Sequence, residues 1–87
     1  MDKPEWWDWP FDCDNVHLVD RMALRHFNEA DLRDMIEHAV AWRPGEIATR
    51  FSIYARYDEV HWKMVVEPDP RAQVVAVVTA YTVEALP

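Results

Sequence analysis

Several familiar classes of protein are excluded by residues that are rare in this chain. A single cysteine excludes a disulfide within the chain, and a single glycine excludes a glycine-rich phosphate-binding loop. No apolar run is long enough to cross a bilayer, and there is no N-terminal secretory signal. We therefore expect a cytoplasmic protein whose thiol stays reduced.

Positive charge is scarce as well. Nine Lys and Arg residues stand against 16 Asp and Glu, which gives a net charge of -7. This balance disfavours non-specific attraction to nucleic acid and to anionic membranes, so we expect no membrane partner. Binding to RNA then requires a local cluster of cations. The 87 residues have room for one small domain.

Tryptophan, by contrast, is concentrated near the N-terminus. Three of the five tryptophans alternate there with acidic residues, and two prolines prevent a long helix. We expect residues 1–14 to form an arm, extended or as a short edge strand, that packs on a single domain of residues 15–87 or on a second copy in a homodimer. The open alternative is an anchor for another protein. Cys13 and His17 have the spacing of a metal pair, but no further ligand accompanies them, so we predict no metal and no cofactor.

Two amphipathic helices are expected after the arm. The first, capped by Asp14 or Asn15, runs to about residue 26, and the second, capped by Asn28, extends through Trp42 and is ended by Pro44 and Gly45. On the first helix His17, Arg21 and Arg25 follow one another at intervals of four residues and lie along one line. An imidazole beside two guanidiniums suits the binding of a phosphate. The alternative is a polar rim beside the core.

After residue 48 the spacing of the apolar residues changes: they no longer recur at helical intervals but at every second position. Residues 51–57 and 60–66 predict a hairpin in which Tyr57 lies opposite Val60 and one face is uniformly apolar. The opposite face then gathers the residues we predict to bind RNA, which are Arg50, Tyr54, Arg56, His61 and Lys63, with Glu67 opposite Arg50. The alternative is a solvated face with no ligand.

Residues 74–81 are almost wholly apolar and β-branched, and we predict that they form the central strand. If Val66 pairs with Val74, Thr79 and Tyr81 come close to His61. The expected core contains Leu18, Met22, Leu32, Ile36, Val40, Phe51, Ile53, Trp62, Met64, Val66 and Val78. The predicted fold class is α+β, with two N-terminal helices packed on one face of an antiparallel sheet of three to four strands.

Two motifs accompany this order of helices and strands: His17-x-x-x-Arg21-Met22-x-x-Arg25 in the first helix and Val77-Val78-Thr79-Ala80-Tyr81 in the last strand. Together they resemble a widespread bacterial family of domains of unknown function, over residues 15–83. That family is grouped with BrnT and RelE-like toxins in the barnase, EndoU, colicin and RelE superfamily of ribonucleases. The resemblance implies RNA binding on the sheet face away from the helices and metal-independent transfer to the ribose 2′-hydroxyl. It implies a catalytic site of His17, Arg21 and Arg25 with Thr79 or Tyr81.

Two functions of different class remain open. The first is a small toxin-like, metal-independent endoribonuclease of a toxin–antitoxin or related conflict system, with RNA as substrate and a cognate antitoxin as partner. In it His17 or His61 moves a proton, arginines hold the phosphate, and Tyr81 donates a proton or stacks on a base. The second is a non-enzymatic acidic binding module, of the antitoxin or immunity type, that neutralises a basic partner.

Overall fold

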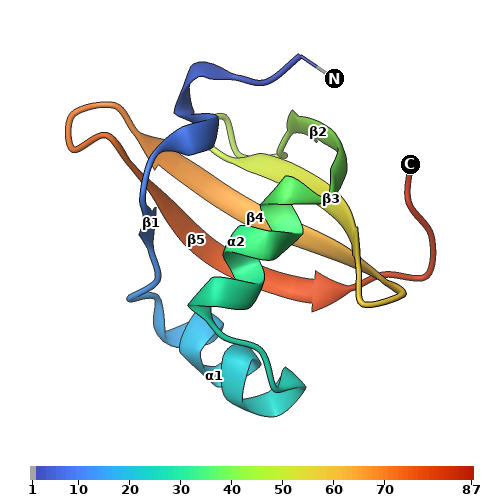
Figure 1. The fold of residues 1–87 in the computed structure, drawn as a ribbon. Helices are drawn as coiled ribbons and strands as arrows, with labels where there is room; N and C mark the ends of the chain where they lie inside the picture. The colour runs from blue at the N-terminus through green and yellow to red at the C-terminus, as the bar shows by residue number, and fades with distance from the viewer. Residues whose placement is uncertain (1) are drawn as a thin grey trace.

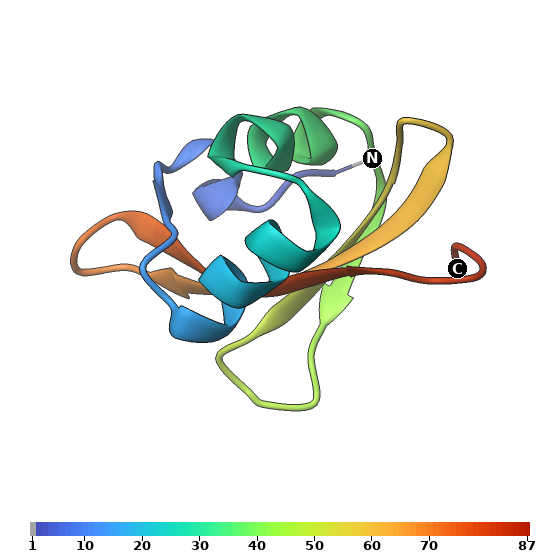
Figure 2. The same ribbon diagram turned by 90° about the horizontal axis from the view of Figure 1, so that it is seen from below.

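The computed structural model describes residues 2–87, and for His17 it describes the backbone alone. The elements in chain order are a 3₁₀ helix η1 (Glu5–Asp8), β1 (Phe11–Asp12), α1 (Val16–Arg25), α2 (Glu29–Glu37), β2 (Ala39–Pro44), β3 (Phe51–Tyr57), β4 (Val60–Asp69) and β5 (Val74–Thr82). The strands form one sheet in the order β1-β5-β4-β3-β2, and both α-helices lie on the same side of it (Figure 1 and Figure 2). No helix of the described chain covers the other side, which we call the helix-free face. Within residues 2–87, no helix has the length and apolarity needed to cross a membrane.

The sheet differs from the predicted one. The prediction of two N-terminal helices on an antiparallel sheet of three to four strands was wrong, because η1 and β1 precede the helices and the sheet has five strands. β1 runs parallel to β5, so the sheet is mixed, and β4 rather than β5 is central. The N–H of Val75 donates to the carbonyl of Pro10 at 2.8 Å. A strand of two residues shows no direction or partner in its sequence.

Strand β2 occupies residues that were expected to prolong the second helix. α2 ends at Glu37, and the next segment pairs antiparallel with β3. The inward-facing Trp42 packs against Phe51 and Trp6, with ring centroids 5.8 and 6.1 Å away. Such aromatic packing outweighs differences in helix propensity, which amount to only a few tenths of a kcal/mol (about 0.7 at most) for ordinary residues.

The β3–β4 hairpin has the predicted register. Tyr57 lies opposite Val60, and each further pair along the two strands is the predicted one. A slip of one residue would turn the apolar face to solvent, and this fixes the register. The two turn residues, Asp58 and Glu59, both adopt left-handed backbone with φ of 53° and 62°.

Both helix starts are capped as predicted. The side-chain oxygen of Asn15 accepts the N–H of Leu18 at 3.4 Å. Leu18, in the first turn of α1, is fully buried. Asn28 and Asp31 form a capping box, in which each side chain accepts the backbone N–H of the other, at 3.0 and 2.8 Å. The caps therefore define the first residue of each helix. α1 packs against β5, and α2 packs against β3.

The N-terminal arm shares the core of the molecule. Trp6 and Trp7 are buried in it, with their ring centroids 5.8 Å apart, so the prediction that the arm packs on the domain is confirmed. Arg33 of α2 binds the arm by two contacts. Its guanidinium lies 3.9 Å from the ring centroid of Phe11 and donates to the carbonyl of Trp9 at 3.4 Å.

Two valines expected in the core lie outside it. Val40 is 50% exposed and Val78 is half-buried. The register shifts at Val40 in β2 and at Val78 in β5, so each valine is the extra residue of a β-bulge. An extra residue has no partner opposite it, and its side chain is turned away from the regular alternation.

Candidate functional site

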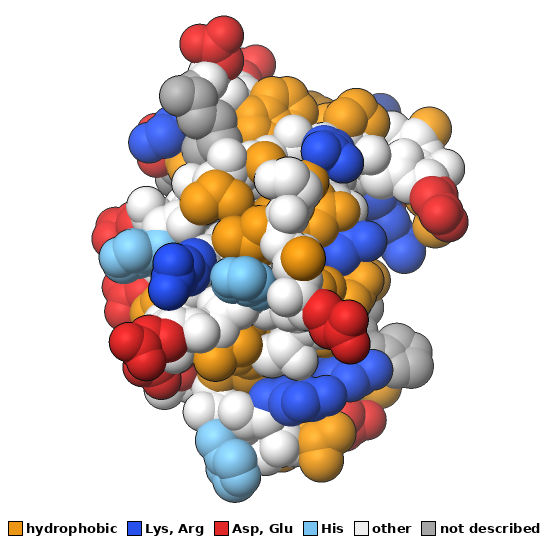
Figure 3. Space-filling model, turned by 90° about the vertical axis from the view of Figure 1, so that its right-hand side faces the viewer, with side chains coloured by type: hydrophobic (Ala, Val, Ile, Leu, Met, Phe, Trp, Pro, Cys, Tyr) orange, Lys and Arg blue, Asp and Glu red, His pale blue; other side chains and the backbone are white. Residues whose placement is uncertain are grey.

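The helix-free face collects the chain's predicted RNA-binding residues. Alternation along four neighbouring strands gives it Arg43 from β2, Ser52, Tyr54 and Arg56 from β3, His61 and Lys63 from β4, and Tyr81 from β5. Tyr54 lies directly opposite Lys63, and Arg56 lies opposite His61. Figure 3 shows a group of Lys and Arg side chains to the right of centre, on the side away from α2. The local cluster of cations that RNA binding requires is therefore present.

A hollow of about 360 Å³ lies within this face. The loop between β2 and β3 projects from the sheet on the side opposite the helices (Figure 2), and it forms one wall of this hollow. Gly45 closes this loop, since its N–H donates to the carbonyl of Arg50 at 2.8 Å and a Cβ would lie only 3.0 Å from that oxygen. The lining residues are Arg43, Pro44, Gly45, Glu46, Ile47, Arg50, Ser52, Tyr54, Lys63 and Val65. Three cations against one carboxylate make the hollow suited to an anion.

Lys63 lies at the centre of the face, between two tyrosine rings. Its Nζ is 5.8 Å from the ring centroid of Tyr54 and 5.9 Å from that of Tyr81. The guanidinium of Arg43 is 6.0 Å from the Tyr54 centroid on another side. Burial by itself would lower the pKa of Lys63, but its interactions with the phenolic groups of Tyr81 and Tyr54 raise the pKa overall. Lys63 is therefore a cation at neutral pH.

Ion pairing leaves most of these cations available to a ligand. Arg50 pairs with Glu67 at 3.3 Å, as predicted, and Thr49 donates to the same carboxylate oxygen at 2.8 Å. This is the one salt bridge among the side chains that the structure describes, so Arg43, Arg56 and Lys63 have no ion-pair partner among them. The Nδ1 atom of His61 lies 3.2 Å from the carbonyl oxygen of Glu84, which leaves Nε2 as the atom that can meet a ligand.

The predicted catalytic residues are spread over three places. The side chain of His17 lies outside the described residues. Arg21 and Thr79 line one hollow of about 430 Å³ beside the edge of β5. Arg25 lines a separate hollow of about 160 Å³ with Tyr57. Tyr81 belongs to the helix-free face, opposite Lys63.

The predicted pairing of the last two strands was wrong. Val66 pairs with Val77 rather than with Val74, and Thr79 consequently lies opposite Val65 and not His61. The bulge in β5 and the turn of residues 70–73 together set this register, and neither is visible as an apolar pattern.

One residue of the face was not identified from the sequence. Arg43 was expected only to mark the end of the second helix, because Ala39, Val40 and Trp42 fit a helical face and Pro44 disfavours helical geometry in the residue before it. The usable signal was the alternation of Trp42 and Arg43 immediately before Pro44, which is typical of an edge strand.

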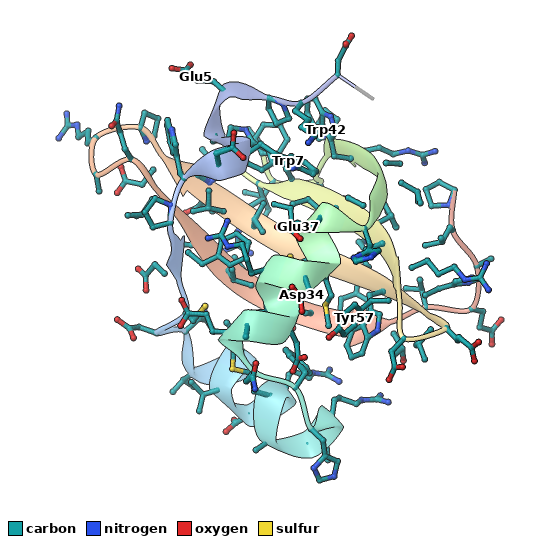
Figure 4. The ribbon with its side chains drawn as sticks, viewed as in Figure 1. Glu5, Trp7, Asp34, Glu37, Trp42 and Tyr57 are labelled. Atoms are coloured by element: carbon teal, nitrogen blue, oxygen red, sulfur yellow. The ribbon has the colours of Figure 1, made fainter. Side chains whose placement is uncertain are left out.

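Negative charge gathers on the opposite side of the molecule. Residues 2–37, which form the arm and both α-helices, contain ten acidic and four basic residues. Figure 4, in which α2 lies in front of the sheet, shows Asp34 and Glu37 on this helix and Glu5 on η1. The chain thus has an acidic helix side and a cationic helix-free face.

Neither the thiol nor a metal site adds further chemistry. Burial, reinforced by Glu29 and Asp12, raises the pKa of Cys13 to about 11, so the thiol is protonated and a poor nucleophile. No group of three His, Cys, Asp or Glu side chains placed to hold a metal ion occurs in the described part of the chain.

Comparison of the chain with family models, with curated proteins and with solved structures finds no match. The resemblance to BrnT and RelE-like toxins therefore stays a prediction, and the argument about function depends on the helix-free face.

Proposed function

We propose that the chain binds cytoplasmic RNA on its helix-free face and acts there as a small, toxin-like, metal-independent endoribonuclease. The composition of that face supports this most: Arg43, Arg56 and Lys63 share it with two tyrosines, Tyr54 and Tyr81, in a chain whose net charge is -7. Cations bind phosphates, and tyrosine rings are platforms for unstacked bases. An antitoxin is the protein partner expected for such an activity.

The proposed reaction needs no metal ion. A base removes the proton of the ribose 2′-hydroxyl, the oxygen attacks the adjacent phosphorus, and the 5′-oxygen leaves with a proton, which yields a 2′,3′-cyclic phosphate and a 5′-hydroxyl. We assign the role of base to His61 and the stabilisation of the phosphorane to Arg56 and Lys63. Tyr81, opposite Lys63, is assigned the role of proton donor. Arg21 and Arg25, on α1, take no part in this assignment.

Cleavage assays test the proposal. The purified chain, free of bound antitoxin, should cut RNA in the presence of a chelator, and His61→Ala should reduce the rate by about 10²-fold or more. The matched control is His38→Ala, at the end of α2, which should leave the rate unchanged. RNA that stays intact with the native chain would rule out the enzyme.

The second candidate is the acidic binding module, and the acidic helix side favours it. A surface with ten carboxylates from residues 2–37 complements a basic partner. This function predicts salt-sensitive capture of a basic protein, weakened by reversing the charges of Asp34 and Glu37, with no cleavage of RNA.

A further inference from the structure

The two edges of the sheet are protected unequally. β2, at one edge, has a bulge at Val40, a charge at Arg43 and a terminal proline, Pro44, and all three hinder the addition of another strand. At the other edge β1 covers β5 only as far as Ala76. On the side away from β4, residues 77–82 of β5 therefore have no strand beside them in the described chain.

The uncovered part of β5 also has a bulge, at Val78, but it has neither a charged side chain nor a proline, the other two features that protect β2. From residue 74 to residue 83 there is no charged side chain and no proline. The N–H of Val83 donates to the carbonyl of His61 at 2.9 Å. Because successive residues of a strand point their backbone groups in opposite directions, those of Ala80 and Thr82 point away from β4. An added strand would bind these groups.

Helix α1 contributes a self-complementary set of side chains beside this edge. Asp20 and Arg21 line, with Val78, the hollow at the margin of β5. Val16 and Leu24, one turn before and one turn after Asp20, are each 67% exposed. An acid, a base and two unburied apolar side chains on one helix suit a twofold contact, in which Asp20 of one copy meets Arg21 of the other.

We propose that two copies of the chain associate through their β5 edges, antiparallel, about a twofold axis perpendicular to the sheet. The occupant is a second copy because the uncharged β5 strand complements itself and the acid and base of α1 pair reciprocally. The two sheets become continuous, and both helix-free faces lie on the same side, so their cations form one surface. The pairing itself does not depend on what that surface binds.

Val78 and Val40 supply matched variants, since each is the extra residue of a bulge at one edge of the sheet. In sedimentation measurements over a concentration series, the native chain should reach the mass of a dimer. Val40→Lys, the control, should form this dimer with the same Kd as the native chain. Val78→Lys puts a charged side chain from each copy at the uncharged junction of the two edges and should raise the dimer Kd by about tenfold or more. Thr82→Pro, which removes only an outward N–H, should have the same effect.

Hydrogen exchange provides a second readout. The amides of Ala80 and Thr82 should exchange more slowly as the protein concentration rises, while the amides of β2 should not change. The proposal is overturned if the native chain is monomeric at every concentration, or if Val40→Lys weakens the dimer as much as Val78→Lys. If Val78→Lys does not melt cooperatively, Thr82→Pro decides alone, and a dimer unaffected by it also overturns the proposal.

Discussion

Side-chain partners determine which residues of the helix-free face can meet a ligand. The carboxylate of Glu67 is shared by Arg50 and Thr49, so Arg50 mainly holds the loop between β2 and β3. Lys63, flanked by two phenolic rings, has its charge stabilised without being neutralised. We expect Lys63 to contribute more to anion binding than Arg50 does.

The hydrogen bond of Tyr57 predicts how the stability of the fold depends on pH. Its hydroxyl donates to Oδ1 of Asp31 at 2.9 Å, and this hydrogen bond is the main cause that raises the pKa of the phenol above its ordinary value of 10. The folded state therefore holds the proton more tightly than the unfolded state, so the stabilisation is complete below pH 10 and is lost as the pH rises through the folded-state pKa.

Denaturation of the native chain and of Tyr57→Phe over a pH series checks this. The native chain should be the more stable at neutral pH, and the two should converge in strongly alkaline solution. A stability difference that grows with pH would contradict the role of the hydrogen bond.

Helices and strands could be predicted where their signal is local. The capping box of Asn28 and Asp31 and the alternation of β3 and β4 are each contained in a few neighbouring residues. A short edge strand in the arm was predicted, but its parallel pairing with β5 was not, and β2 was not predicted at all, because both depend on contacts with distant parts of the chain. The segment Ala39–Pro44 fits a helical face as well as it fits a bulged strand, and only the packing of Trp42 decides between them.

The β3–β4 turn offers a prediction about stability. Asp58 and Glu59 both have positive φ, which costs about 1–2 kcal/mol per residue for a side chain with a Cβ. Two-residue hairpin turns of this kind favour glycine at the second position. Glu59→Gly should therefore stabilise the fold by about 1 kcal/mol, measured by chemical denaturation. Glu46→Gly, in a loop position without positive φ, is the control and should not stabilise it.

Over the entire chain, charge is divided between the two sides of the sheet. Residues 2–37 hold ten of the 16 acidic residues, while the helix-free face holds cations that have no ion-pair partner in the described chain. The sequence predicted five residues of that face, because alternation in the hairpin places them. It did not predict that Arg43 joins them from β2, or that Arg21 and Arg25 line separate hollows, since these positions depend on how distant elements pack.

Titration of the labelled chain with a short single-stranded RNA, followed by NMR, decides whether the helix-free face binds RNA. Shifts should concentrate at Arg43, Tyr54, Lys63 and Tyr81, and the affinity should fall with salt. Lys63→Ala should weaken binding and reduce the slope of log K against log salt concentration by about 0.7, the value for one phosphate contact on a single strand. Lys3→Ala, which changes the chain's other lysine, should leave the affinity for RNA and its salt dependence unchanged. Shifts confined to α2 and the arm, or equal losses from the two lysine variants, would contradict the assignment of RNA binding to the helix-free face.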